Sequence, residues 1–400
     1  MTKQGLKENL PQFILLVVIN AFVGGMVGLE RSIFPRFAEE VYHISSSLAI
    51  LNFIVAFGIS KAITNYFTGR LSNFLGRRNI LVLGWILALP IPFIFIYAES
   101  WSLIIFANIL LGISQGMTWS TTVVMKIELA GAKDRGLAMG LNEFAGYLSV
   151  GIIAFLSGMI AENYGLRVYP FYLGIALSII GFLLSIFLVK DTKSLMQTEI
   201  QEKDDTKTQQ NVFFETTFKN KTLSSITQAG LVNNLNDGMI WGLFPILLIS
   251  YGYSDQKIGI LAAIYPIIWG MGQLFTGRLA DLHNNKNMLF WGMFLQALAI
   301  AAISRFHNFF PLALAAILLG IGTALVYPTF LVALSKVTHP KQRAESIGVF
   351  RLWRDLGYAF GAIISGYSAD LLGIPSAILL IAVITLISAV IIKIRMPDVS

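Results

Sequence analysis

The chain alternates between long apolar runs and short polar turns. Breaking the runs at charged residues, Pro and Gly predicts twelve helical spans, most of which approach or exceed the ~18 to 20 residues needed to cross a bilayer. The spans are expected at residues 12–35, 45–68, 78–98, 102–126, 136–162, 168–190, 222–250, 256–278, 288–305, 310–335, 344–371 and 374–394. The pattern therefore predicts an all-α protein that crosses a membrane many times.

A different kind of sequence separates two sets of six spans. Between Lys190 and Lys221, the run TEIQEKDDTKTQQN is polar, charged and poor in residues that form a core. Such a segment is expected to be a solvated linker. The predicted organisation is one six-helix bundle over residues 1–190, a cytoplasmic linker over 191–221 and a second bundle over 222–400.

The two halves repeat each other at an offset of 208 residues. The stretch GRLSNFLGRRN, at 69–79, returns in altered form as GRLADLHNNKN, from residue 277. The same offset relates further pairs: Arg135 with Arg343, Gly158 with Gly366, and Glu162 with Asp370. Two six-helix halves that share one plan predict two bundles related by pseudo-twofold symmetry, the arrangement that alternating access requires.

Composition and charge agree with a membrane protein and exclude other classes. The mean hydropathy is +0.71, and 56% of residues are hydrophobic against 13% charged. The net charge of +7 comes from basic residues in the turns, where they set membrane orientation, so nucleic-acid binding is not expected. Their distribution predicts cytoplasmic termini, and we expect a monomer in the inner membrane of a bacterium.

Cofactor chemistry is not expected. The chain has no Cys, which excludes disulfides, thiolate metal sites and Cys nucleophiles. Its four His residues show no spacing of a metal pair, and no nucleophile motif or phosphate loop can be read. We therefore expect neither a cofactor, nor a metal, nor enzymatic activity.

The stretch at 69–79 resembles the signature loop of the major facilitator superfamily, G-x-L-A-D-R-x-G-R-R/K. Gly69, Leu71, Gly76, Arg77 and Arg78 match that form, with Arg70 at its variable second position, while Asn73 replaces its Asp and Phe74 its Arg. In the second half Gly277, Leu279, Ala280 and Asp281 match, and the basic end is lost. The resemblance implies two six-helix bundles that rock around a central cavity. In the family the Asp contacts the facing bundle, so the latch is expected to depend more on Asp281 here.

Two features of proton-coupled relatives are missing. Gly112 stands where those relatives have an Arg three residues before Gln115 and Gly116, and the fifth span, GYLSVGIIAFLSG, contains no Pro. Proton antiport is therefore not implied by these motifs.

Charges inside apolar spans cost ~2.5 to 3.5 kcal/mol each, so each needs a partner, a watery cavity or a function. Glu30 and Arg31 are placed near the outer end of the first span. There they form either an interfacial pair or an outer gate that contacts substrate.

A second group of charges is expected toward the cytoplasmic half. Arg351, Arg354 and Asp355 share one helix face, and we predict that Lys61 pairs with Asp355 across the two bundles as a gate. Substrate contact and a role within one bundle are the alternatives. Glu143 matches Arg351 through the 208-residue offset and is either a protonated carboxylate or the partner of Lys126.

The seventh span contains a polar cluster near mid-membrane, in LVNNLNDGMIWG. The resemblance implies that the first, fourth, seventh and tenth helices line the cavity. The predicted cavity residues are Asn233, Asn236, Asp237, Trp241, Gln115, Trp119, Thr122, Thr323 and Tyr327. A satisfied polar cluster between helices is the alternative for the seventh span, because polar residues also join membrane helices.

The sequence thus predicts a secondary active transporter of a small organic solute. We favour proton-coupled efflux of drug-like or amphiphilic metabolites. The alternative is proton-coupled uptake of a polar or zwitterionic nutrient, which the mixed charges would suit. A membrane enzyme lacks a reactive set, and a channel would not need the internal repeat.

Overall fold

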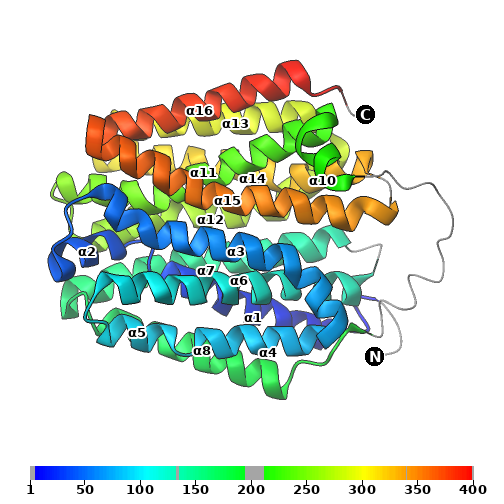
Figure 1. Cartoon of the computed structure of the whole chain (residues 1–400), viewed down its shortest axis with the longest axis horizontal. Coiled ribbons are helices and arrows are strands. Elements are labelled where there is room, and N and C mark those ends of the chain that lie inside the picture. Colours follow the sequence, from blue (N-terminus) through cyan, green and yellow to red (C-terminus); the bar gives the residue numbers. More distant parts are fainter. Residues whose placement is uncertain (1–4, 132–134, 194–210, 339, 399–400) are drawn as a thin grey trace.

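The computed structural model describes residues 5–131, 135–193, 211–338 and 340–398. The two halves of the chain form two helical bundles packed side by side, and both termini lie at the same end of the molecule (Figure 1). The first half contains α1 (Leu10–Gly28), α2 (Phe34–Tyr42), α3 (Ser47–Leu75), α4 (Arg77–Ala88), α5 (Ile91–Tyr97), α6 (Trp101–Ala130), α7 (Arg135–Tyr164) and α8 (Tyr169–Phe187).

The second half has the same plan. It contains α10 (Val212–Phe214), a π-helical turn (Glu215–Lys219), α11 (Lys221–Ser250), α12 (Asp255–Leu282), α13 (Asn285–Ile303), α14 (Phe309–Val337), α15 (Pro340–Leu372) and α16 (Ile374–Arg395). We call the end of the molecule that carries α2 the α2 end, and the opposite end the terminal end.

Ten segments are long and apolar enough to cross a membrane by length and composition. One of these combines α4 and α5, which meet at Pro90. Two further helices, α11 and α15, have 30 and 33 residues and complete the predicted set of twelve. Their buried polar and charged residues, such as Asn233, Asp237, Arg354 and Asp355, lower their mean hydropathy.

The first span differs most from the prediction. The helix α1 ends at Gly28 rather than near residue 35, and a turn over 29–33 leads into the short helix α2. Because α1 stops early, Glu30 and Arg31 lie in this turn and are buried, at 0% and 5% exposure. They are not exposed at the membrane surface, and no ion pair joins them within the described chain.

Helices from the two halves meet along two lines. The helix α7 packs along α12, and α3 packs along α15. The 208-residue offset converts the first pair into the second, so the contacts follow the pseudo-twofold symmetry. Close approach depends on Gly: a Cβ at Gly158 would lie 2.7 Å from the carbonyl oxygen of Asp255, and one at Gly58 would lie 2.8 Å from Cβ of Tyr358.

The signature loop is the short break between α3 and α4. Gly76 adopts φ +91°, a backbone conformation that favours Gly, and allows the chain to turn. Arg77 pairs with Glu128 of α6 at 2.9 Å, and the Asp191 carboxylate accepts from the backbone N–H of Arg78 at 2.9 Å. Both basic residues therefore hold their own bundle together at the terminal end. The side chains of Arg70, Asn73 and Asp281 lie outside the described residues, so the predicted latch on Asp281 stays a prediction.

Candidate substrate pocket and interbundle contacts

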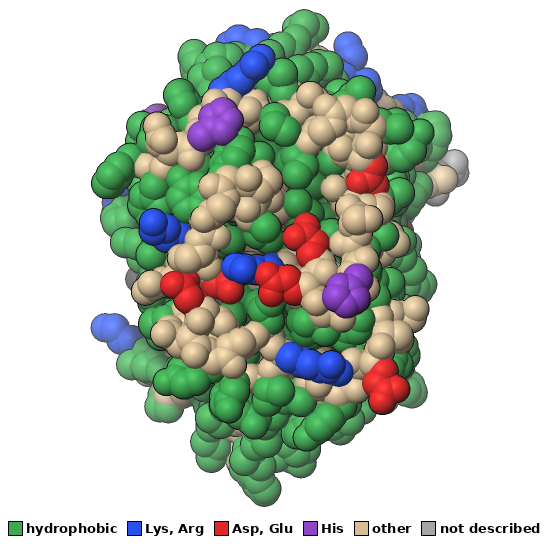
Figure 2. All heavy atoms as spheres, turned by 90° about the vertical axis from the view of Figure 1, so that its left-hand side faces the viewer, with side chains coloured by type: hydrophobic (Ala, Val, Ile, Leu, Met, Phe, Trp, Pro, Cys, Tyr) green, Lys and Arg blue, Asp and Glu red, His purple; other side chains and the backbone are tan. Residues whose placement is uncertain are grey.

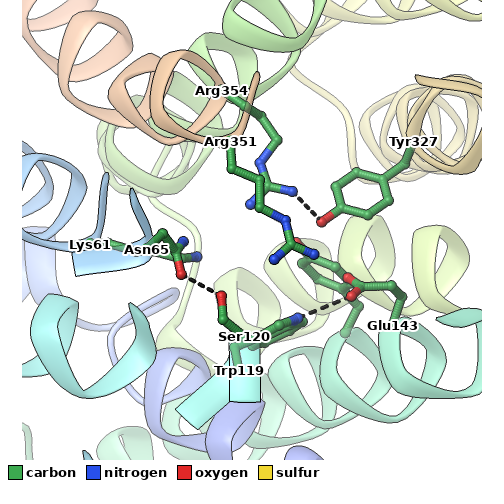
Figure 3. A pocket seen from close by; sticks show the side chains of 9 residues that line it. Lys61, Asn65, Trp119, Ser120, Glu143, Tyr327, Arg351 and Arg354 are labelled. Atoms are coloured by element: carbon green, nitrogen blue, oxygen red, sulfur yellow. Dashed lines mark hydrogen bonds between the residues drawn. The ribbon is translucent and has the colours of Figure 1, made fainter. Parts of the chain in front are cut away.

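A small pocket lies between the two bundles (Figure 3). The first half contributes Lys61 and Asn65 from α3, Trp119 and Ser120 from α6, and Glu143 and Tyr147 from α7. The second half contributes Tyr327 from α14 and Arg351 and Arg354 from α15. Its volume of about 20 Å³ has room for one or two water molecules, so the bundles must move apart before an organic solute fits.

Lys61 points into this pocket but does not form the predicted ion pair with Asp355. No carboxylate of the described residues lies within ion-pair distance of its ammonium. Nζ instead lies 5.0 Å from the ring centre of Tyr358, 5.2 Å from Phe57 and 5.7 Å from Trp119. Aromatic faces attract a cation without neutralising it.

Asp355 has other partners. Arg354 donates to Oδ1 at 2.6 Å, and Asn65 of α3 donates to Oδ2. The predicted contact between α3 and α15 at Asp355 thus exists, but its partner is the Asn65 amide, one helical turn from Lys61. Arg354 also donates to the Tyr327 hydroxyl at 2.6 Å. Asp355 and Arg354 therefore neutralise each other within one helix.

Glu143 and Lys126 are also not partners. The Glu143 Oε1 accepts from the Trp119 indole at 3.0 Å and from Asn142 at 2.9 Å, and its Oε2 is buried without a partner. Lys126 donates to the backbone oxygen of Leu16 at 3.1 Å. Glu143 therefore lines the pocket as a carboxylate that forms no ion pair with the described residues.

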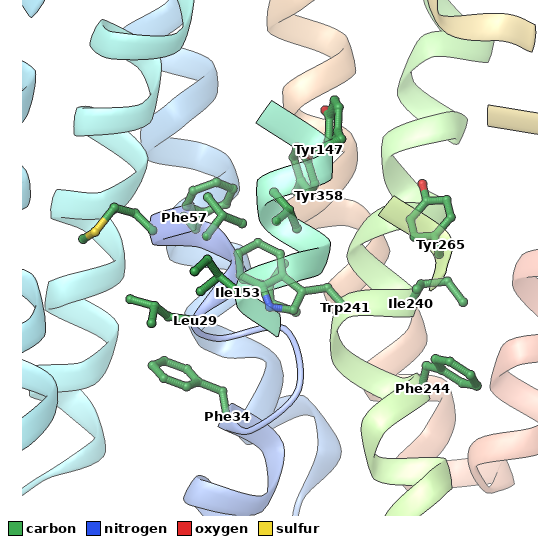
Figure 4. Packing of buried hydrophobic residues seen from close by; sticks show 14 of the residues in the cluster. Leu29, Phe34, Phe57, Tyr147, Ile153, Ile240, Trp241, Phe244, Tyr265 and Tyr358 are labelled. Carbon is green, nitrogen blue, oxygen red and sulfur yellow. The ribbon is translucent and has the colours of Figure 1, made fainter. Parts of the chain in front are cut away.

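The buried pair of Arg31 and Asp237 joins the two halves. Arg31 Nη1 and Nη2 donate to Oδ1 and Oδ2 of Asp237 at 2.8 and 3.1 Å, and Asp237 is 1% exposed. The guanidinium also lies 4.4 Å from the ring centre of Trp241. Trp241 packs among Phe57, Ile153 and Tyr358 (Figure 4). It therefore packs between the bundles and does not line the pocket. Glu30 lies beside this pair, and its buried carboxylate faces the side chain of Asn108.

The two Asn residues of the seventh span point away from the pocket. Gln296 of α13 donates to Asn233 at 3.0 Å and accepts from Asn236 at 2.9 Å. Thr385 of α16 donates to Asn236 at 2.6 Å. This is the satisfied polar cluster between helices that was the alternative, and it belongs to the second bundle alone.

Three other predicted cavity residues also bond within their own bundle. Gln115 donates to the backbone of Val23 in α1, Thr122 donates to Asn20, and Thr323 donates to Leu319 one turn back. Of the predicted cavity set, Trp119 and Tyr327 line the pocket. Tyr147, Asn65 and Ser120 were missed. Tyr147 lies one helical turn after Glu143, a spacing that could have suggested it.

We expect Gln296→Leu to lower the unfolding temperature without changing the apparent affinity for a transported solute. The substitution leaves the buried Asn233 carbonyl oxygen and the buried Asn236 amide N–H without the partner that Gln296 supplied, at a cost of about 1 to 3 kcal/mol for each group. Thermal unfolding and counterflow kinetics of the same preparation measure the two effects. Thr385→Val is the milder control, because it removes one bond from the same cluster. A changed affinity with unchanged stability would instead place the cluster in the solute path.

The α2 end is closed by polar contacts between the halves. The carboxylate of Asp370, at the end of α15, accepts from the backbone N–H groups of Ser47 and Leu48 at 2.6 and 3.2 Å. Its repeat equivalent, Glu162 at the end of α7, accepts from the N–H of Gln256 at 2.5 Å. Each carboxylate thus caps the first turn of a helix in the other half.

A further ion pair lies at this end. Arg36 of α2 donates to Asp255 of α12 at 2.9 Å. Figure 2 shows acidic and basic side chains gathered across the middle of this face. These contacts close the α2 end of the pocket in the conformation described.

These features define a class: a two-bundle membrane carrier with its pocket at the pseudo-twofold interface. The family model of the Major Facilitator Superfamily matches residues 13–229 and 226–399. The chain therefore belongs to the major facilitator superfamily of transporters, and its fold is the two-bundle fold of that family.

Curated relatives and solved structures agree with this assignment. Multidrug resistance protein 2 of Bacillus subtilis is 24% identical over 378 residues, which cover 92% of this chain and 91% of that protein. The proton-coupled antiporter flippase LtaA of Staphylococcus saprophyticus is 24% identical, with 90% and 87% covered. The crystal structure of the nucleoside transporter NupG matches with a TM-score of 0.77 at 15% identity, covering 96% of this chain and all of that one.

Proposed function

We propose that the protein is a proton-coupled exporter of drug-like or amphiphilic solutes that works by alternating access. The observation that carries the proposal is the pocket between the bundles, which takes side chains from both halves. Rocking the bundles would expose such a pocket to each side of the membrane in turn. Relatives named as a multidrug resistance protein and a proton-coupled antiporter support export and proton coupling. We place the termini and the central linker in the cytoplasm, so that the α2 end faces outward.

We assign the proton to Asp237. A proton on this carboxylate removes the negative charge that Arg31 contacts, and so weakens the bond that closes the α2 end. The charged and titratable neighbours of Asp237 are Arg31, Glu30, Tyr265 of α12 and Tyr358 of α15, with Tyr147 of α7 and Lys61 of α3 farther off. Protonation of Asp237 would therefore shift the equilibrium toward the form that is open at the α2 end.

The test is solute transport by Asp237→Asn in proteoliposomes, across a range of imposed pH differences. We expect counterflow to persist while the dependence on the pH difference is lost, because Asn cannot exchange a proton. Glu99→Gln, in an exposed loop, is the matched control and should retain the dependence. An unchanged pH dependence in Asp237→Asn would exclude Asp237 as the proton site.

A second candidate is proton-coupled uptake of a polar or zwitterionic nutrient. The observation in its favour is that the pocket carries both signs of charge, with Glu143 facing the same space as Lys61 and Arg351. The direction of net solute movement under an inward proton gradient separates the two: export supports the first candidate and accumulation supports the second.

A further inference from the structure

Two cations of the pocket form no ion pair with any carboxylate of the described residues. Lys61 is 7% exposed and is surrounded by aromatic rings, and Arg351 bonds to no group of the described residues, with its Nε buried. Buried charges in membrane helices are normally paired, face water or serve a function. Here both groups line the same space between the bundles, so one ligand could satisfy both.

The positive and negative groups in and around the pocket differ in number. Three cations line it, namely Lys61, Arg351 and Arg354. Against them stand Asp355, which bonds to Arg354, and Glu143, which bonds to Trp119 and Asn142. With both carboxylates ionised, these five groups carry an excess of one positive charge. A single negative charge on a ligand would balance it.

The pocket also has an aromatic wall. Trp119, Tyr147 and Tyr327 line it, and Trp269 stacks on Tyr147 with ring centres 3.5 Å apart. Figure 3 shows the Arg351 guanidinium pointing into the space that Trp119, Ser120 and Glu143 border. A flat apolar body can pack against such rings while its charged end meets the cations.

We propose that the transported solute is an amphiphilic monoanion, a carboxylate attached to an aromatic or other flat apolar body. Lys61 and Arg351 bind the carboxylate and the rings bind the body. A phosphate monoester fits less well, because its charge of about −1.5 to −2 exceeds the one charge to be balanced. The inference rests on the proposed transport function and specifies its substrate class. It also suits export, because an inside-negative potential drives an anion outward.

The first experiment measures binding by calorimetry, with the full-length protein in nanodiscs. The probes are 2-naphthoate, the cation 2-naphthylmethylammonium, the zwitterion 3-(2-naphthyl)alanine and 2-naphthyl phosphate. We expect 2-naphthoate to bind most tightly. Tighter binding of the cation, the zwitterion or the phosphate would each overturn the proposal.

The second experiment removes the cations one at a time. Lys61→Met and Arg351→Gln should each weaken 2-naphthoate binding about tenfold or more, since a hydrogen bond to a charged group is lost. Arg351→Lys should recover part of that loss. Arg305→Gln removes the same charge from an exposed position at the α2 end and should bind normally.

Stability separates a ligand-binding role from a structural one. Because Lys61 forms no ion pair with the described residues, Lys61→Met should unfold at the same temperature as the parent or higher. A lower unfolding temperature with unchanged naphthoate binding would show that Lys61 serves the fold and would overturn the proposal.

Counterflow measurements test the transport function separately from the proposed substrate class. If 2-naphthoate binds through Lys61 and Arg351 and exchanges in counterflow, both stand. If it binds in the same way but no exchange occurs, the substrate-binding site stands and the transport function fails. If only the cationic probe binds and exchanges, transport stands and the anion proposal fails.

Discussion

Arg31→Met and Asp237→Leu should each destabilise the conformation that is closed at the α2 end by about 3 to 5 kcal/mol, because each leaves a buried charge without its partner. The bond is bidentate, and Arg31 comes from the first half while Asp237 comes from the second. Its loss therefore acts on the contact between bundles as well as on folding. A free-energy change of ~1.4 kcal/mol alters an equilibrium constant tenfold. The ratio of open to closed forms should therefore rise by about a hundredfold or more.

The double variant Arg31→Met/Asp237→Leu separates charge burial from transport. Two apolar side chains leave no unpaired charge, so the unfolding temperature should return toward the parent value while proton-coupled transport stays lost. Glu40→Ala breaks the exposed pair of Glu40 with Arg36 and serves as the control, with an expected effect of about 0.5 kcal/mol.

The natural absence of Cys makes the conformational shift measurable. A single Cys at Ala263, buried in α12 near Gly151 of α7, should react slowly with a maleimide in the parent. The same Cys should react much faster in a protein that also carries Arg31→Met. Equal labelling rates in both backgrounds, together with equal unfolding temperatures, would show that the Arg31 and Asp237 bond does not hold the bundles together.

Leu48→Cys/Gly366→Cys should form a disulfide that stops transport completely and reversibly. A Cβ at Gly366 would lie 3.5 Å from Cβ of Leu48, within the range of disulfides, and the two residues belong to different bundles. The bond would fix the contact between α3 and α15 at the α2 end. Transport should cease on oxidation and return on reduction.

Each single Cys variant is the control for the disulfide. Gly366→Cys places a side chain 2.9 Å from Cα of Leu48, so it should lower transport somewhat in either redox state. Only the double variant should respond to oxidation. Full transport by a cross-linked sample, with the bond confirmed by mass shift, would contradict a cycle that opens the α2 end.

The sequence alone determined the helices, the internal repeat and the family. Apolar runs of bilayer length must form helices in lipid, because backbone groups there can bond only to each other. The boundaries of α3 and of α6 were predicted to within several residues. The one large error, in α1, arose because Gly28, Glu30 and Arg31 were interpreted as the outer part of the first span. They are the signals at which the helix ends, and the turn that follows is buried.

Tertiary structure alone decided the partners of the polar side chains. Helical spacing placed Asn233, Asn236 and Asp237 on one short stretch of α11, yet two of them bond to Gln296 and the third crosses to Arg31. Residues a few positions apart on a helix face different neighbours, and those neighbours come from distant parts of the chain. A sequence shows that a buried charge needs a partner, but only the packing of the two bundles decides which residue it is.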